Sequence, residues 1–238
     1  MRIFAISDLH LDGNQNKSME VFGSHWAGHW EKIRNNWRAV VSDEDYVLVS
    51  GDISWAMKLK DAVSDFEQMR ELPGNIVMIK GNHDFWHDSL SKTLNALPER
   101  MFFLQNDTID AGEFTIAGTR LWKQRNEDDF TDEDEKIYQR ELIRLKLSLD
   151  RTHGKKTIVM THYPPYSVKK ESTEFTDLIS KYNVAKVIFG HIHGFIRPDL
   201  KKLTDDKLSY ASFETTIDGI PYILTSCDYI DFAPVQLY

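Results

Sequence analysis

Side chains that can bind metal ions or move protons recur in this sequence directly after short apolar runs. Each run has the length and composition of a buried strand. The polar groups that follow the runs are Asp8-Leu9-His10, Gly51-Asp52, Gly81-Asn82-His83-Asp84, Thr161-His162 and Gly190-His191-Ile192-His193. Since α/β proteins keep their sites in the crevice beyond the carboxyl ends of their strands, we expect these side chains to meet there.

A metal centre is the chemistry that these residue types favour. Burying many polar groups without partners is costly, and metal ions would supply the partners. Nitrogen and oxygen ligands without cysteine suit Mn, Fe, Zn or Co, and a carboxylate such as that of Asp52 can bridge two ions about 3.5 to 4 Å apart. The strand-end candidates are Asp8, His10, Asp52, Asn82, His83, His162, His191 and His193.

The segment Gly81-Asn82-His83-Asp84 places an amide, an imidazole and a carboxylate together after the apolar run at 75–80. The glycine permits a sharp turn, so that the next side chains can point into the crevice. Taken alone, the segment has a second interpretation, in which Asn82 and Asp84 cap a helix that begins near Phe85. The other strand-end motifs favour the metal centre.

A separate metal site is a weaker hypothesis for the segment 19–41. Apolar residues recur there at three and four positions, which predicts an amphipathic helix. His25 and His29 are four residues apart and could share an ion on that helix. No carboxylate or cysteine completes the pattern, so we interpret them as residues of a polar face or cleft edge.

Strands and helices alternate in the rest of the pattern, which predicts parallel neighbours joined by right-handed crossovers. Helices are expected at 56–72, 85–97 and from Thr131 to near Gly154. Residues 123–135 are strongly polar and acidic, which predicts a mobile loop, and a lid over the site is the alternative. Strands are expected at 2–7, 45–50, 75–80, 102–104, 108–110, 113–117, 156–160, 184–189, 210–217, 221–226 and 235–238.

Composition narrows the classes of protein that the chain can represent. The 238 residues are 41% hydrophobic, enough for a full core, and we expect one domain over 1–238. A net charge of −8 argues against a non-specific grip on nucleic acid or an anionic membrane. One cysteine, Cys227, excludes an internal disulfide framework, and no secretory signal or membrane span is visible. We therefore expect a cytoplasmic protein.

The five motifs, in this order, resemble those of the calcineurin-like metallophosphoesterase superfamily, and they extend over residues 8 to 193. The resemblance implies an α/β fold of four layers, an αββα sandwich in which helices flank two packed mixed sheets. It also implies two metal ions. The first would be held by Asp8, His10, Asp52 and His193, and the second by Asp52, Asn82, His162 and His191.

The resemblance further implies hydrolysis at phosphorus, in which a hydroxide that bridges the two ions attacks the phosphate ester. His83 would be catalytic without binding metal, since it would stabilise the transition state or protonate the leaving oxygen. Asp84 would orient and charge His83. The expected substrate is a small phosphate mono- or diester. The alternatives are a nuclease of the same superfamily, which normally needs a basic channel, and a scaffold that has lost the chemistry.

Trp55 departs from the superfamily pattern, since many relatives carry a charged residue at this position. This difference does not affect the assignment of the metal ligands. It weakens any inference that this chain shares the substrate preference of those relatives. Trp55, Trp86 and Trp122 follow strand ends and could form an aromatic wall beside the site, with core packing as the favoured alternative. Lys169 and Lys170 could meet a substrate phosphate, with a solvated loop as the favoured alternative.

Overall fold

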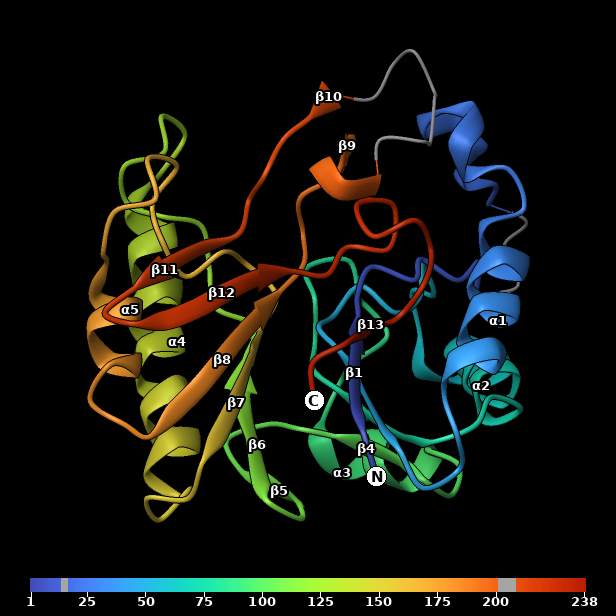
Figure 1. The fold of residues 1–238 in the computed structure, drawn as a ribbon, viewed down its shortest axis with the longest axis horizontal. Coiled ribbons are helices and arrows are strands. Elements are labelled where there is room, and N and C mark those ends of the chain that lie inside the picture. The colour runs from blue at the N-terminus through green and yellow to red at the C-terminus, as the bar shows by residue number, and fades with distance from the viewer. Residues whose placement is uncertain (14–16, 201–208) are drawn as a thin grey trace.

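The computed structural model describes residues 1–13, 17–200 and 209–238. Two β-sheets pack face to face, and helices cover the outer side of each sheet (Figure 1). The described helices and strands thus form the four-layer arrangement of mixed sheets that the resemblance implied. No helix among these residues is long and apolar enough to cross a membrane.

The first sheet has five strands in the order β13-β1-β2-β3-β4. Its strands β1 to β4 run parallel, and β13 is antiparallel to β1. Every residue of β1 is buried, in agreement with the continuous apolar runs that predicted these strands. The bounds are Ile3–Ile6 for β1, Tyr46–Val49 for β2, Asn75–Met78 for β3, Met101–Phe103 for β4 and Val235–Gln236 for β13.

The second sheet has six strands in the order β11-β12-β8-β7-β6-β5. The four central strands are parallel, and hairpins add β5 and β11 antiparallel at the two edges. Gly112 and Gly219 take positive φ in the two hairpin turns. The bounds are Thr108–Ala111 for β5, Phe114–Thr119 for β6, Thr157–Thr161 for β7, Val184–Phe189 for β8, Thr215–Ile217 for β11 and Ile220–Leu224 for β12.

The helices form the two outer layers. In Figure 1, α4 (Asp132–Asp150) and α5 (Glu174–Ile179) cover the second sheet, while α1 (His29–Val40) and α2 (Leu59–Arg70) lie on the far side of the first. Apolar side chains such as Ala5, Leu48 and Ile158 fill the space between the sheets. Alternate residues of the same strands, such as Phe4 and Val47, pack instead with the helices.

Several predicted elements differ from the structure. The helix expected over 19–41 is two 3₁₀ turns, Met19–Phe22 and Ser24–Trp26, followed by α1, because Gly23 and Gly28 take φ of 140° and 60°. The helix expected at 85–97 is confined to α3 (Leu90–Ala96), whose N-cap is Ser89. The strand expected at 210–217 is divided between β10 (Ser209–Tyr210), which pairs with β9 (Phe195–Ile196), and β11.

The helix expected to begin after Thr131 is confirmed. The Thr131 hydroxyl accepts the N–H of Asp134, and the Asp134 carboxylate accepts the N–H of Thr131, so both ends of a capping box are present. The helix ends at Asp150, a turn before Gly154. Helix α5, by contrast, has no counterpart in the predictions, because its six residues are too few to show a clear apolar period.

Candidate metal centre

The two sheets join where β1 and β12 end. The N–H of Ser7 donates to the carbonyl of Thr225, and the N–H of Cys227 donates to the carbonyl of Ser7. These hydrogen bonds place the end of β1 beside the ends of β8 and β12. The end of β2 lies next to the end of β1 in the first sheet. The five motifs therefore leave their strands at one common edge.

The backbone is strained at this edge. Asp8, His10, Asp52 and His191 take φ of 59°, 45°, 52° and 73°, in the left-handed region that side chains with a Cβ disfavour. Such conformations cluster at functional sites, where the surrounding structure fixes them. In this chain they turn the chain sharply after β1, β2 and β8, so that the side chains converge at the common edge of the two sheets.

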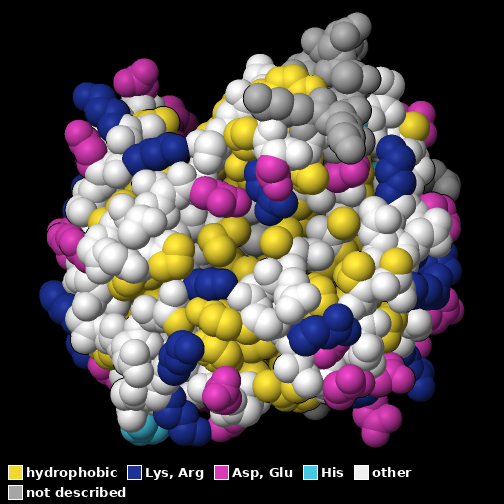
Figure 2. All heavy atoms as spheres, in the orientation of Figure 1, with side chains coloured by type: hydrophobic (Ala, Val, Ile, Leu, Met, Phe, Trp, Pro, Cys, Tyr) yellow, Lys and Arg dark blue, Asp and Glu magenta, His cyan; other side chains and the backbone are white. Residues whose placement is uncertain are grey.

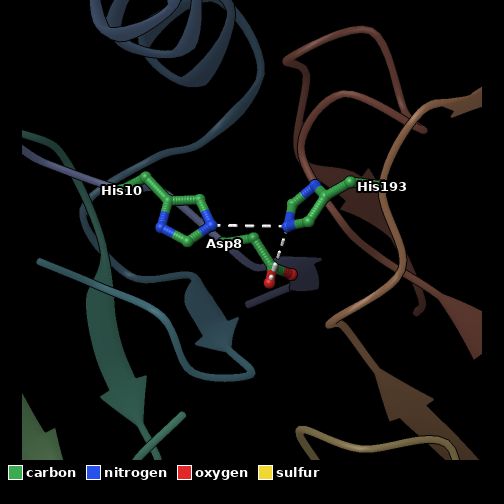
Figure 3. Close-up of side chains that lie close together, drawn as sticks. All are labelled: Asp8, His10 and His193. Atoms are coloured by element: carbon green, nitrogen blue, oxygen red, sulfur yellow. Dashed lines mark hydrogen bonds and ion pairs between the residues drawn. The ribbon is translucent and has the colours of Figure 1, made fainter. Parts of the chain in front are cut away.

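Asp8, His10 and His193 form the first group (Figure 3). Nε2 of His193 lies 3.3 Å from Nε2 of His10 and 3.3 Å from Oδ1 of Asp8. Nδ1 of His10 is buried and has no hydrogen-bond partner among the described residues. The first group thus presents two imidazole nitrogens and a carboxylate oxygen to one point, an arrangement that a cation would hold together.

Asp52, Asn82, His162 and His191 form the second group. Oδ1 of Asn82 lies 2.6 Å from Nε2 of His162 and 2.9 Å from Nδ1 of His191. The carboxylate of Asp52 connects the two groups, since its Oδ2 lies 3.5 Å from Nε2 of His162 and 3.9 Å from Nε2 of His10. All seven predicted ligand residues therefore lie in one cluster, with Asp52 between its halves.

Burial and crowding shift the pKa values of the cluster. Burial, together with the charges of Asp8 and Asp84, raises the pKa of Asp52 well above its usual value. Burial lowers the pKa of His162 to about 4 and that of His191 to about 3, so both rings are neutral near pH 7. Burial opposes ionisation of Asp8, but the neighbouring histidines, His193 first, lower its pKa. Neutral imidazoles are the form that binds metal ions.

Asp228 is a site residue that the sequence analysis missed. It is buried, and its Oδ1 lies 2.9 Å from Nδ1 of His193 while its Oδ2 accepts the N–H of Gly194. Burial lowers the pKa of His193, but the carboxylates of Asp228 and Asp8 raise it well above normal. A carboxylate on the far nitrogen of a ligand imidazole fixes its tautomer and orientation. The sequence signal was only an acid four residues after Leu224, the last residue of β12.

Asp84 acts on the backbone. Its carboxylate accepts the N–H groups of Asp52, Ile53, Ser54 and Gly81 and the indole N–H of Trp86, at 2.7 to 3.2 Å. It therefore neither caps a helix at Phe85 nor, among the described contacts, hydrogen-bonds to the His83 ring. It ties the end of β2 to the turn after β3, and it acts on the pKa of His83 only through its charge.

His83 lies at the mouth of the cluster. Its backbone N–H donates to Oδ1 of Asp52, and its ring centroid lies 4.6 Å from that of Trp55 and 5.9 Å from that of His10. Burial lowers its pKa. Its side chain lines a pocket beside the first group, together with Trp55.

An apolar pocket of about 350 Å³ adjoins the first group. Trp55 stacks on His10 with ring centroids 4.8 Å apart, and Trp26 approaches His193 at 5.6 Å. Neither Lys nor Arg occurs among its described lining residues. The pocket is lined by Met19, Phe22, His25, Trp26, Trp55 and Gly194, together with His10, Asp52, His83, His191 and His193 from the cluster.

The predicted aromatic wall is only partly correct. Trp55 lines the apolar pocket, but Trp86 is 1% exposed and packs between Phe66 and Phe103 in the core. Trp122 lies against Tyr163 and beneath Arg120. The wall is completed by Trp26, which the sequence analysis placed on a helix face. The shared site for His25 and His29 is not supported, since His29 bonds the carbonyl of Leu9 and neither belongs to a metal group of the described residues.

A second pocket, of about 280 Å³, lies on the other side of His191. The acidic loop supplies one wall through Gln124 and Glu127. Ion pairs fix this loop to the helices, because Lys123 contacts Asp134 and Arg125 contacts Glu174. Lys170 also lines the pocket, but its ammonium donates to the carbonyl of Ser212 at 2.7 Å. The loop is thus held as a wall, which differs from the mobile loop expected.

Comparison with known families decides the class. A family model for calcineurin-like phosphoesterases matches residues 1–195. The chain belongs to the calcineurin-like phosphoesterases. The family is one of metal-dependent phosphoester hydrolases, as the motifs implied.

Comparisons with individual proteins give the fold. The phosphopantetheinyl hydrolase PptH of Mycobacterium tuberculosis is similar with a TM-score of 0.59 and 12% identity, over 99% of this chain and 95% of that one. A protein of unknown function from Aquifex aeolicus aligns over the same shares at 17% identity and a TM-score of 0.49. The search of curated proteins finds no match.

The residues present fit the metal ions of a calcineurin-like phosphoesterase. Ligand atoms of Asp8, His10 and His193 lie within 4.8 Å of one another, as do those of Asp8, Asp52 and His162. The buried carboxylates repel one another, and the nearby imidazoles of His162 and His191 are neutral. Cations would relieve the repulsion and use the free nitrogen lone pairs.

Replacing Asp228 by Asn should weaken metal binding at the first group. The amide cannot stabilise His193 electrostatically, and carboxylates that orient a ligand imidazole in this way contribute about 10- to 100-fold in metal affinity. Titration of the metal-depleted protein with Mn²⁺ in a calorimeter measures the effect. Asp231→Asn, a nearby carboxylate outside the cluster, serves as the control. Equal affinities of the Asp228→Asn and parent proteins would contradict the role assigned to Asp228.

His162 should make the metal-free protein sensitive to acid. Its pKa is about 4 in the folded protein, against 6.5 for an unperturbed histidine, so the unfolded chain binds the proton more tightly. Above pH 6.5 the shifted pKa of His162 does not affect the free energy of unfolding. As the pH falls towards 4 it destabilises the folded protein, by about 2 kcal/mol at pH 5. Urea unfolding of the parent and His162→Gln proteins at pH 7.5 and pH 5 measures it. The free energy of unfolding of the parent, relative to that of the variant, should be smaller at pH 5 than at pH 7.5. An equal difference at the two pH values would contradict the lowered pKa of His162.

Proposed function

We propose that this protein hydrolyses a small phosphate ester whose organic group lies in the apolar pocket beside two metal ions. The observation that carries the proposal is the convergence of candidate ligands from five strand ends. Ligand atoms of Asp8, Asp52 and His162 lie within 4.8 Å of one another, as do those of Asp8, His10 and His193, and Asn82 contacts His162 and His191. The first ion would be held by Asp8, His10, Asp52 and His193, and the second by Asp52, Asn82, His162 and His191. Mn, Fe, Zn or Co suit this donor set.

When bound, the two ions would supply a water-derived nucleophile near neutral pH and would offset the charge of the phosphoryl oxygens. The protein's own contribution is to fix the ligands and the ester. The left-handed backbones and the Asp84 carboxylate hold the strand ends, and Asp228 holds the ring of His193. These groups are in place before the substrate binds, and such preorganisation avoids a cost during the reaction.

His83 is placed to act on the leaving group. Its ring lines the apolar pocket at the side of Trp55, where the organic part of an ester would lie. Its lowered pKa disfavours the protonated form in the metal-free protein, and the negative charge of a bound phosphate would raise it again. A protonated His83 would then donate its proton to the departing ester oxygen.

The surroundings of the site favour a small substrate over a nucleic acid. The apolar pocket has Trp26 and Trp55 as walls and no Lys or Arg among its described lining residues. On the face shown in Figure 2, Lys, Arg, Asp and Glu side chains are interspersed. A nuclease needs a basic surface to hold the phosphate backbone. The complete ligand set and the free position of His83 argue against a scaffold without activity.

The proposal is tested with the purified protein loaded with Mn²⁺. A chromogenic phosphate monoester, a chromogenic diester, cyclic nucleotides and single-stranded DNA are compared under identical conditions, with Asp52→Asn as the inactive control. We expect turnover of at least one small ester, slower or absent cleavage of DNA, and loss of both turnover and bound metal in Asp52→Asn. Bound metal without turnover of any ester would contradict the proposal, and preferential cleavage of DNA would favour the nuclease.

His83→Ala should retain its metal ions and lose activity. A missing general acid costs about 10²- to 10⁴-fold in kcat, with a smaller change in KM. An aryl ester with an acidic phenol leaves without a proton and should be affected least, whereas an alkyl phosphate should be affected most. His153→Ala, at an exposed histidine of another loop, is the control. Equal losses on both esters would exclude general-acid catalysis, and loss of metal would overturn the assignment.

A further inference from the structure

A polar cavity of about 370 Å³ lies between the ends of β3, β4 and β6 and one face of α4. It shares no lining residue with the apolar pocket or with the second pocket. Its basic residues are Lys80, Arg120, Arg140 and Arg144. We call it the basic cavity. Nothing in the metal centre requires a concentration of cations at this place.

The charge of the basic cavity is unusual in a protein with a net charge of −8. Three carboxylates lie close to its four cations, those of Asp84, Asp88 and Glu141, and all three are already engaged. Asp84 accepts the backbone N–H groups at the ends of β2 and β3. Asp88 pairs with Lys92, and the buried Glu141 accepts from the Thr119 hydroxyl and from Arg144. His87 adds no carboxylate, and its ring nitrogens contact Thr93 and Gln105. Positive charge is therefore in excess.

Two of these cationic side chains have N–H groups that make no hydrogen bond among the described residues. Among the described residues, neither the ammonium of Lys80 nor the guanidinium of Arg120 donates a recorded hydrogen bond. The guanidinium of Arg120 lies 4.5 Å above the Trp122 ring and 3.9 Å from a Glu141 oxygen, with 17% of the side chain exposed. Lys80 is half-buried and lines the same cavity as Arg120. The two groups are thus held close together and partly out of water against their mutual repulsion.

We propose that the basic cavity binds a small organic phosphate through its phosphoryl group. Arginine forks match the oxygens of a phosphoryl group, and lysine adds a point charge, so the mixture of residues suits a dianion better than a single carboxylate. The cavity is also larger than a phosphoryl group alone, which leaves room for an attached organic part. Gln105 and His87 lie on the same wall and can contact that part.

The ligand would contact both sheets. Lys80 lies just beyond β3 and directly before Gly81, whereas Arg120 follows β6, and the Arg120 carbonyl accepts the N–H groups of His162 and Tyr163. A phosphoryl group held by both cations thus joins the segments that carry Asn82 and His162. The proposal concerns binding in the basic cavity alone, so it does not depend on the reaction at the metal centre.

Binding of inorganic pyrophosphate to the full-length protein tests the proposal. The metal ions are first removed by dialysis against a chelator and then against buffer, so that the metal centre cannot retain the probe. Isothermal titration calorimetry in 0.1 M NaCl should show one site with a dissociation constant below about 1 mM. Absence of binding by the parent protein at 5 mM pyrophosphate, a concentration about five times that limit, would overturn the proposal.

Two variants and one matched control locate the site. Lys80→Met and Arg140→Gln should each weaken binding by about tenfold, as expected for the loss of a charged hydrogen bond. Lys146→Gln removes the same charge from the same helix as Arg140, but Lys146 pairs with Asp150 outside the cavity, so binding should change less than twofold. If Lys146→Gln weakens pyrophosphate binding as much as Arg140→Gln does, the binding is non-specific electrostatic attraction. That result would overturn the proposed site in the basic cavity. Arg140 is exposed, so Arg140→Gln decides the outcome if Lys80→Met does not fold.

Discussion

The burial of three carboxylates at one edge, those of Asp8, Asp52 and Asp84, is the constraint on which the rest of the site depends. All three are at most 2% exposed, and burial together with the charges of Asp8 and Asp84 raises the pKa of Asp52. Each is stabilised differently. Asp84 accepts backbone N–H groups, Asp8 accepts the N–H of His191 and the hydroxyl of Ser226, and Asp52 is left with histidines and one backbone N–H. Asp52 thus has the greatest need of a cation, and it lies where the two ligand groups meet.

Close packing at the strand ends explains the glycines of the motifs. A Cβ added at Gly81 would lie 2.1 Å from Oδ1 of Asp52, and one added at Gly190 would lie 2.3 Å from Oδ2 of Asp8. Such distances are impossible for real atoms, so any side chain at these positions would displace a ligand carboxylate. Neither glycine takes a positive φ, so the close approach of one strand end to another requires them rather than the conformation of their own turns.

These contacts also explain which features the sequence could predict. Asp, Asn or His at the end of an apolar run, in three motifs with a preceding glycine, is a local pattern, so the candidate ligands and the strands that carry them could be read from the sequence. Asp228 could not, because its partner His193 is distant in sequence and no glycine or histidine stands beside it. The interrupted helix at 19–41 was missed because the apolar period continues through Gly23 and Gly28, where the backbone departs from the helix. Trp26 owes its place in the pocket to that interruption.

The residues of the motifs and the residues that line the adjoining pockets have different effects on substrate preference. The motif residues define which bond can be broken, and they say nothing about the group attached to it. Under the proposed function that group would meet Trp26 and Trp55 on one side of the cluster, and Tyr163, Gln124 and Phe213 line the second pocket beyond His191. Trp55 and Tyr163 follow motifs closely in sequence, whereas Trp26, Gln124 and Phe213 do not. Substrate preference within the family can therefore change through the 3₁₀ turns and the acidic loop while the strand ends, and with them the chemistry, stay fixed.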